Sequence, residues 1–178
     1  PQIGEQAAKE SLSEIREYLR GSDMVYLTAG MGGGTGTGAL PIIAQTAKEM
    51  GILTVAVVTK PFLFEGARRM RYAEEGISKL RQCVDALIVV PNDRLLEICR
   101  KETPLSESFS MVDEVLRQAV QGVTDLVTRP GMVNVDFADL KSVMKHAGTA
   151  VMGVGCAKGE NRIENALREA LESPLMEC

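Results

Sequence analysis

The sequence has little that could hold a metal ion or form disulfide bonds. It contains a single histidine, His146, and its four cysteines show no C-x-x-C spacing. A zinc site built from cysteine and histidine would therefore have to use His146. Free thiols in a reducing compartment are the simpler interpretation of Cys83, Cys99, Cys156 and Cys178. We expect no metal ligands from the protein itself, and a cytoplasmic location.

Long hydrophobic runs are also lacking, and so is an excess of positive charge. No apolar stretch approaches the length of a membrane span, and we expect neither a signal peptide nor direct membrane insertion. The net charge of −4 argues against a broad nucleic-acid-binding surface. With 178 residues, 45% of them hydrophobic, the chain can form one substantial core and the beginning of a second unit.

The most informative feature that is present is a glycine-rich run from Gly30 to Gly38. It follows Met24–Ala29, an apolar, β-branched and aromatic stretch typical of a buried strand, and it precedes a segment, Ala39–Met50, with apolar residues at helical spacing. A glycine loop between a strand and a helix can present backbone N–H groups to an anion, and the helix dipole favours the same charge. A flexible linker is the alternative, but linkers seldom separate two such well-defined elements. We interpret the run as a phosphate-binding loop.

Residues that are missing from the run and from the strand after it argue against two common types of phosphate-binding loop. It is not a Walker loop, because it has no lysine and no Gly-Lys-Ser/Thr follows it. Gly34, Gly36 and Ala39 satisfy the looser dinucleotide pattern G-x-G-x-x-A. That pattern requires an acidic residue at the end of the second strand to bind the ribose, but Leu53–Val58 is followed by no carboxylate before Glu65. A Rossmann-type NAD-binding enzyme therefore remains only as an alternative.

Apolar strands and amphipathic helices alternate along the chain. The strands Met24–Ala29, Leu53–Val58 and Ala86–Val90 are nearly all apolar, and helical patterns separate them. This order predicts an α/β fold with a parallel sheet covered by helices on both faces. The helices expected in this part of the chain are residues 3–19, 39–50, 68–82 and 93–100.

A long helix is expected from Glu107 to Thr128, with Ser106 as its N-cap and Arg129-Pro130-Gly131 as its stop. About two dozen helical residues span roughly 30 Å, enough to bridge two domains. We place the domain boundary at residues 129–133, so that residues 1–128 form one unit and 129–178 begin a second α/β unit. The second unit is expected to contain a helix at 137–146, a strand at 150–156 and a helix at 160–172.

The glycine run carries a resemblance to a known family. Residues Gly32 to Gly38 read GGGTGTG, which resembles the signature of the tubulin/FtsZ GTPases, and Ala29-Gly30-Met31 before it is similar to their bacterial cell-division branch. Three further segments resemble the family in the same order: TKPFLFEG from Thr59, VPNDRLL from Val90 and NVDFAD from Asn134. The resemblance extends to Ser173-Pro-Leu175 and so covers essentially the whole chain.

The resemblance implies a GTPase that binds GTP or GDP with Mg²⁺ and polymerises head to tail into filaments of the bacterial division ring at mid-cell. Magnesium would keep its waters and bind the phosphates, so no protein ligand is expected. The implied partners are further copies of the protein, and membrane-tethering and division proteins reached through a C-terminal tail that this chain lacks. About the first third of the GTPase domain, with another phosphate loop, is expected before Pro1, so this chain alone need not be active.

The resemblance assigns the phosphates to the glycine run and the ribose and phosphates to Glu65 and Arg69. It assigns the base to Phe109 and Asp113, which lie four residues apart and hence on one helix face. A ring there could stack on guanine while the carboxylate accepts from its N1 and 2-amino groups; a core phenylalanine and a surface aspartate are the plainer interpretation. Asn92 is a weaker candidate, since it also suits a helix cap. The phosphate-binding residues are expected to be Gly32, Gly33, Gly34, Thr35 and Gly36.

Two aspartates, Asp136 and Asp139, lie three residues apart at the start of an expected helix. By themselves they are typical of an N-cap and a first-turn acid. Together with Asn134 they match the family motif that enters the nucleotide site of the neighbouring subunit and positions the attacking water. The resemblance therefore implies that hydrolysis is completed across a subunit contact. A structural fragment that binds without hydrolysing remains an alternative.

Overall fold

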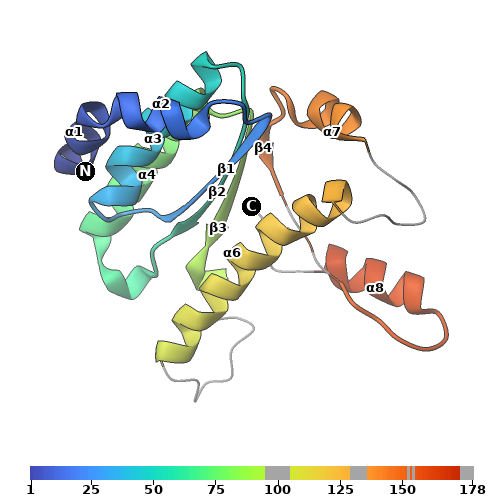
Figure 1. Ribbon diagram of the computed structural model, residues 1–178. Coiled ribbons are helices and arrows are strands. Elements are labelled where there is room, and N and C mark those ends of the chain that lie inside the picture. The colour runs from blue at the N-terminus through green and yellow to red at the C-terminus, as the bar shows by residue number, and fades with distance from the viewer. Residues whose placement is uncertain (95–104, 129–135, 152, 154, 173–178) are drawn as a thin grey trace.

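A four-stranded parallel sheet forms the centre of the computed structural model, which describes residues 1–94, 105–128, 136–151, 153 and 155–172 (Figure 1). The strand order is β1-β2-β3-β4. Met24 lies opposite Leu53 and Val55 opposite Ala86, so the carboxyl ends of the first three strands lie along one edge of the sheet. The strands are β1 (Met24–Gly30), β2 (Leu53–Lys60), β3 (Ala86–Pro91) and β4 (Gly148–Ala150). The predicted parallel α/β fold is confirmed.

Helices cover both faces of the sheet, as Figure 1 shows. Ala56 and Val58 of β2 pack in the core cluster formed with α3 (Thr35–Glu49) and α4 (Ala67–Cys83). Val57, which points to the opposite face, packs against α6 (Leu105–Thr128). Every residue of β2 except Lys60 is buried, as a central strand between two helical layers requires. The remaining elements are α1 (Gln2–Glu10), α2 (Leu12–Leu19), η1 (Leu63–Glu65), α7 (Phe137–Met144) and α8 (Arg162–Leu171).

The helices differ from the sequence-based expectation at their ends. The predicted helix 3–19 is two helices that meet at Ser11, although backbone bonds from Ser11 N to Ala7 O and from Ile15 N to Ser11 O continue across the junction. The long helix begins at Leu105, so Ser106 lies inside its first turn and is not its N-cap. The rest of α6 confirms the predicted helix.

The C-terminal elements are shorter than predicted. Helix α7 ends at Met144, and two left-handed residues, His146 with φ 60° and Gly148 with φ 75°, turn the chain directly into β4. Where a strand was expected at 150–156, the structure has β4 at Gly148–Ala150, which pairs with β3 in the same sheet; residues 152 and 154 lie outside the described residues. The predicted helix 160–172 spans Arg162–Leu171. Residues 92–94 are helical, one residue ahead of the predicted start of the helix 93–100; the rest of that helix and the boundary at 129–133 lie outside the described residues.

Candidate functional site

The glycine run forms a tight turn at the carboxyl end of β1. The N–H of Met31 donates to the carbonyl of Thr59 at 2.9 Å, which continues the pairing with β2 past the strand end. Gly32 has φ 99°, a conformation that favours glycine, and its N–H donates to Oγ1 of Thr37 at 2.8 Å. Gly32 and Thr37 are both buried. These two residues therefore fix the turn, and the N–H of Gly32 is already occupied.

The next part of the run is open. Gly33, Gly34 and Thr35 are exposed, and a methyl group added at either glycine would meet nothing within 4 Å. Helix α3 begins here, earlier than expected, and its first backbone bond runs from Gly38 N to Gly34 O at 3.2 Å. The N–H groups at the start of α3 precede that bond and lack an intrahelical acceptor. No acidic residue lies in the first turn of α3, so this surface fits an anion such as a phosphate.

Behind the open surface the backbone is closely packed. A Cβ at Gly36 would lie 2.7 Å from the carbonyl oxygen of Gly30 and 2.9 Å from Cβ of Ala29. On the other side, the carbonyl of Arg69 lies against Gly32, where an added Cβ would approach it to 2.8 Å. The start of α4 is thus in direct contact with the glycine turn. The loop is held from both sides and presents a rigid backbone surface.

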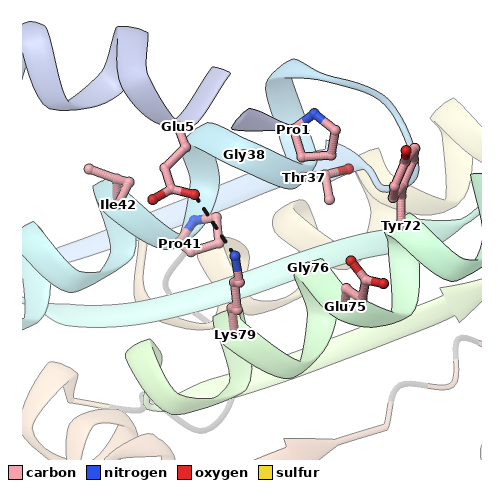
Figure 2. Close-up of a pocket in the computed structure, with 10 residues that line it drawn as sticks. All are labelled: Pro1, Glu5, Thr37, Gly38, Pro41, Ile42, Tyr72, Glu75, Gly76 and Lys79. Atoms are coloured by element: carbon pink, nitrogen blue, oxygen red, sulfur yellow. Dashed lines mark ion pairs between the residues drawn. The ribbon is translucent and has the colours of Figure 1, made fainter. Parts of the chain in front are cut away.

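A cavity of about 220 Å³ lies beside the loop, between α1, α3 and α4 (Figure 2). Glu5 and Lys79 lie across it at 3.9 Å, and Glu75 adds a second carboxylate. A hydrogen bond from Lys9 and the charges of Lys9 and Lys79 lower the pKa of Glu5, which is therefore ionised at neutral pH. Two carboxylates against one lysine do not favour a phosphate. The open face at Gly33 and Gly34 is the better anion site.

Glu65 and Arg69 join the site from the segment that follows β2. One oxygen of Glu65, Oε1, accepts the N–H of Phe62 at 2.9 Å, and the other forms an ion pair with Arg69. The side chain of Glu65 is only 13% exposed, whereas that of Arg69 is 58% exposed. Glu65 therefore orients Arg69, whose remaining guanidinium donors are free to meet a ligand beside the loop.

Aromatic and amide side chains complete this edge. Phe109 of α6 is 41% exposed and packs edge-on against the buried Phe62, with ring centroids 5.3 Å apart. Asp113 is exposed one turn further along α6. Asn92, at the end of β3, is 4% exposed, and its Oδ1 has no hydrogen-bond partner among the described residues. A buried acceptor without a partner suits a ligand donor. Phe62 and Thr37, which organise the site, lie within the TKPFLFEG and GGGTGTG segments but were not among the predicted site residues.

The aspartate pair occupies the opposite edge of the sheet. Asp136 is the N-cap of α7 and its Oδ1 accepts the N–H of Ala138 at 3.5 Å, while Asp139 lies in the first turn. Both are exposed. Asn134, the third predicted member of this motif, lies outside the described residues. The capping geometry holds whatever further role the two carboxylates have.

The packing of α7 places the aspartate pair at the amino ends of the strands. Phe137 and Met144 pack against Leu53 and Ala86, the first residues of β2 and β3. The glycine turn, Arg69 and Asn92 lie at the carboxyl ends of the same strands. Strands of six to eight residues separate the two edges by roughly 20–25 Å. Within one copy, the aspartates and the glycine loop therefore lie at opposite ends of the strands.

Comparison with known proteins agrees with this arrangement. Residues 1–100 match the model of the Tubulin/FtsZ family, GTPase domain. The chain belongs to this family. It is 56% identical over 177 residues to "Cell division protein FtsZ" of Pseudomonas aeruginosa PAO1 and 58% identical to that of Coxiella burnetii. These alignments cover 99% of this chain but only 45% and 46% of the relatives, so the chain spans about half the length of the FtsZ proteins it matches.

Solved structures show the same relationship. The structure described as "FtsZ dimer, empty (M. jannaschii)" aligns with a TM-score of 0.95 and 50% identity, over 99% of this chain and 51% of that one. CetZ from Methanosaeta thermophila aligns with a TM-score of 0.78 over 94% of this chain and 48% of that one. At 21% identity the CetZ likeness concerns the fold alone.

The described part of the chain contains neither a metal-binding cluster nor a membrane-spanning helix. No group of three or more histidine, cysteine, aspartate or glutamate side chains there is arranged to hold a metal ion. Among the helices of residues 1–94, 105–128, 136–151 and 155–172, none is both long and apolar enough to span a membrane.

Proposed function

We propose that this chain carries two complementary halves of the GTPase site of a filament-forming cell-division protein. The glycine-loop edge binds GTP, and the aspartate edge completes the site of the next copy. The observation that carries this proposal is the separation of the edges by the full length of the sheet. Membership of the tubulin/FtsZ family and the cell-division names of its relatives support it.

The geometry at the carboxyl edge supports guanine nucleotide binding. Backbone N–H groups from Gly33 to Gly36 would donate to the terminal phosphates, and Arg69 would add charge-assisted hydrogen bonds. Phe109 would stack on the base while Asp113 accepts from guanine N1 and the 2-amino group, and the unpaired Oδ1 of Asn92 offers a further acceptor. Bound Mg²⁺ would supply neutralisation of the phosphate charge. Glu65 acts here mainly by holding Arg69.

At the amino edge, Asp136 and Asp139 would orient the water that attacks the terminal phosphate of the neighbouring copy, with Asn134 beside them. If the carboxylates and the phosphate loop of one subunit lay in the same site, a single folded copy could hydrolyse GTP without assembling. Delivery by another subunit instead makes hydrolysis wait for assembly. Each copy offers one edge of each kind, so the contact is head to tail and gives an open filament.

The wider assignments follow from the same proposal. Residues 1–128 would form the nucleotide-binding unit, and residues 129–178 would carry the aspartate segment and the start of a C-terminal domain. The principal partner would be a further copy of the protein, within a cytoplasmic division ring at mid-cell. Membrane-tethering and division proteins would bind a C-terminal tail beyond this chain.

GTP turnover measured against protein concentration tests the proposal. The assay is run on this chain, on this chain mixed with the preceding part of a relative, and on a protein of the relatives' full length. We expect turnover per molecule to rise steeply above a threshold concentration and to be lost in Asp139→Ala, with GTP affinity retained. Glu164→Ala, an exposed carboxylate on α8, serves as the matched control.

Other outcomes of these assays would contradict the proposal or favour one of the alternative functions. Turnover that is independent of concentration, or insensitive to Asp139→Ala, contradicts a site shared between copies. GTP binding without turnover in any of the three forms favours the non-hydrolysing structural fragment. Binding of NAD in place of GTP would revive the dinucleotide alternative, which the family match leaves without support.

A further inference from the structure

A single buried carboxylate lies where the aspartate-bearing helix joins the sheet. Asp85, directly before β3, is 5% exposed, although it carries no recognisable motif. Its Oδ2 accepts the N–H of Thr54 at 3.0 Å, and its own N–H donates to the carbonyl of Thr54 at 2.9 Å. Asp85 is thereby fixed to the start of β2. A carboxylate this buried is expected only where its partners compensate the cost of desolvation.

The same residue also holds the chain that leaves α7. The carbonyl oxygen of Asp85 accepts the N–H of Gly148 at 2.9 Å, and Oδ1 lies 3.6 Å from Nδ1 of His146. His146 and Gly148 are the two left-handed residues of the turn between α7 and β4. Three elements, β2, β3 and the α7–β4 turn, therefore meet at Asp85.

The surroundings of Asp85 are basic. Lys48, Lys141, Lys145 and His146 line a cavity of about 300 Å³ into which its carboxyl faces. The lysines lie near the C-terminal ends of α3 and α7, where positive charge is favoured by the helix dipoles. They therefore do not by themselves indicate a bound anion. His146 is the basic side chain of this cavity that lies within 4 Å of Asp85.

Helix α7 is short enough for its ends to move together. Its eight residues span about 12 Å, and Asp136 and Asp139 lie at the end opposite to the turn. Leu140 of α7 is buried, and Val143 is 75% exposed. Phe137 and Met144 pack the helix against the start of β2 and β3, and the contacts of Asp85 fix the turn that follows it. The direction in which the aspartate pair projects therefore depends on this turn as well as on the packing of the helix.

We propose that Asp85 and His146 are positioning residues for the aspartate pair, acting by clamping the α7–β4 turn to the start of β2 and β3. This inference rests on the proposed function. Neither residue touches nucleotide, and both lie at the edge away from the glycine loop. Loosening the clamp leaves GTP binding intact and reduces the rate at which assembled copies hydrolyse it.

The test uses His146→Ala in the full-length protein, because His146 is 71% exposed and its removal does not threaten the core. Lys145→Ala removes the adjacent exposed side chain of the same cavity and is the matched control. Measurements are GTP affinity, the threshold concentration for turnover, turnover per assembled copy, and amide hydrogen exchange across α7. Asp85→Asn and the double variant complete a mutant cycle.

We expect His146→Ala to reduce turnover per assembled copy about threefold to tenfold, to speed exchange in α7, and to leave GTP affinity unchanged. Lys145→Ala should do none of these. Asp85→Asn should behave like His146→Ala, and the double variant should add little because the two residues act as one contact. His146→Gln, which retains a hydrogen-bonding side chain, should restore part of the rate.

Unchanged α7 exchange and turnover in His146→Ala would overturn the proposal. So would a parallel loss of GTP affinity, turnover and thermal stability, which would mean a general structural role. If the unaltered protein hydrolyses no GTP, the proposed function fails, yet faster α7 exchange in His146→Ala would still establish the clamp. The two failures are thus distinguishable.

Discussion

The two edges of the parallel sheet are built in opposite ways. At the carboxyl edge the backbone is packed so closely that a methyl group at Gly36 would collide with Gly30, and the turn is held by Thr37 and Thr59. At the amino edge a short helix, α7, carries two exposed aspartates and has only Leu140 fully buried. The surface proposed to bind phosphate is closely packed, while the acids proposed to act on another molecule project into solvent.

This difference suggests separate failure modes for the two edges. Changes in the closely packed part of the carboxyl edge should disturb fold and nucleotide affinity together, because the same backbone contacts serve both. Changes of exposed side chains at the amino edge should spare both and alter only what happens between copies. The following experiments test whether the two edges can be altered independently of each other.

Mixing two inactive variants should have the largest effect. Asp139→Ala removes an acid from the amino edge, and Gly34→Val obstructs the carboxyl edge with a side chain on the open loop surface. Each alone should lose GTP turnover by at least about a hundredfold, the scale of a missing catalytic group. In a mixture, contacts between the intact edges should restore part of the activity. A mixture as inactive as its components would contradict a site formed between copies.

Two alanine substitutions in the glycine run should separate packing from binding. At Gly36 the added Cβ meets backbone at 2.7 Å, so Gly36→Ala should lower the free energy of unfolding by about 1–3 kcal/mol and weaken GTP binding as well. At Gly33 the added Cβ meets nothing within 4 Å, so Gly33→Ala should leave unfolding unchanged and weaken GTP about tenfold. Denaturant unfolding and nucleotide titration measure the two effects. Equal losses of stability would show that the open surface has been misassigned.

Leu140→Ala examines how firmly α7 is seated. Leu140 is 9% exposed, and its truncation should cost about 2 kcal/mol or more of unfolding free energy if α7 unfolds with the sheet. If α7 instead opens independently, global unfolding should hardly change while exchange of the α7 amides accelerates. Val143→Ala, on the exposed side of α7, is the control. Loss of GTP affinity in Leu140→Ala would contradict the independence of the edges.

The smallest effect is expected on α6, which runs alongside the sheet between the two edges (Figure 1). Hydrogen bonds from Arg117 and Gln118 lower the pKa of Glu114 from 4.5 to about 2. Because the folded pKa is depressed, the associated stability is present above pH 4.5 and is lost as the pH falls through about 2. Arg117→Ala should raise the pKa of Glu114 in a carboxyl NMR titration. GTP affinity and turnover should not change, since Glu114 is fully exposed and lies in neither site.

Much of the sheet could be predicted because its strands are continuous apolar runs. The first three strands begin where expected and extend only one or two residues further. The start of α3 was missed because glycine and threonine are poor helix formers, and here the bond from Gly32 to Thr37 stabilises the turn. The break at Ser11 and the early end of α7 depend on local backbone conformation that periodicity does not record.

The residues of the candidate site could be selected from the sequence only through the family resemblance. What the sequence could not give is their arrangement: the contact of Arg69 with the glycine turn, the orphaned oxygen of Asn92, and the placement of Asp136 and Asp139 at the other edge. Asp85 was not among the residues predicted from the sequence. A single acidic residue before a strand has no periodic or motif signal, and its importance appears only when the fold brings three elements to it.

The parallel direction of the strands has a consequence for any filament built by the proposed contact. Every copy points the same way, so the two tips of a filament are chemically different. At one tip a nucleotide has no neighbour to supply acids, and at the other a pair of acids has no nucleotide to meet. A filament would therefore always hold one fewer complete site than it has subunits, and the nucleotide at one tip would outlast those in the interior.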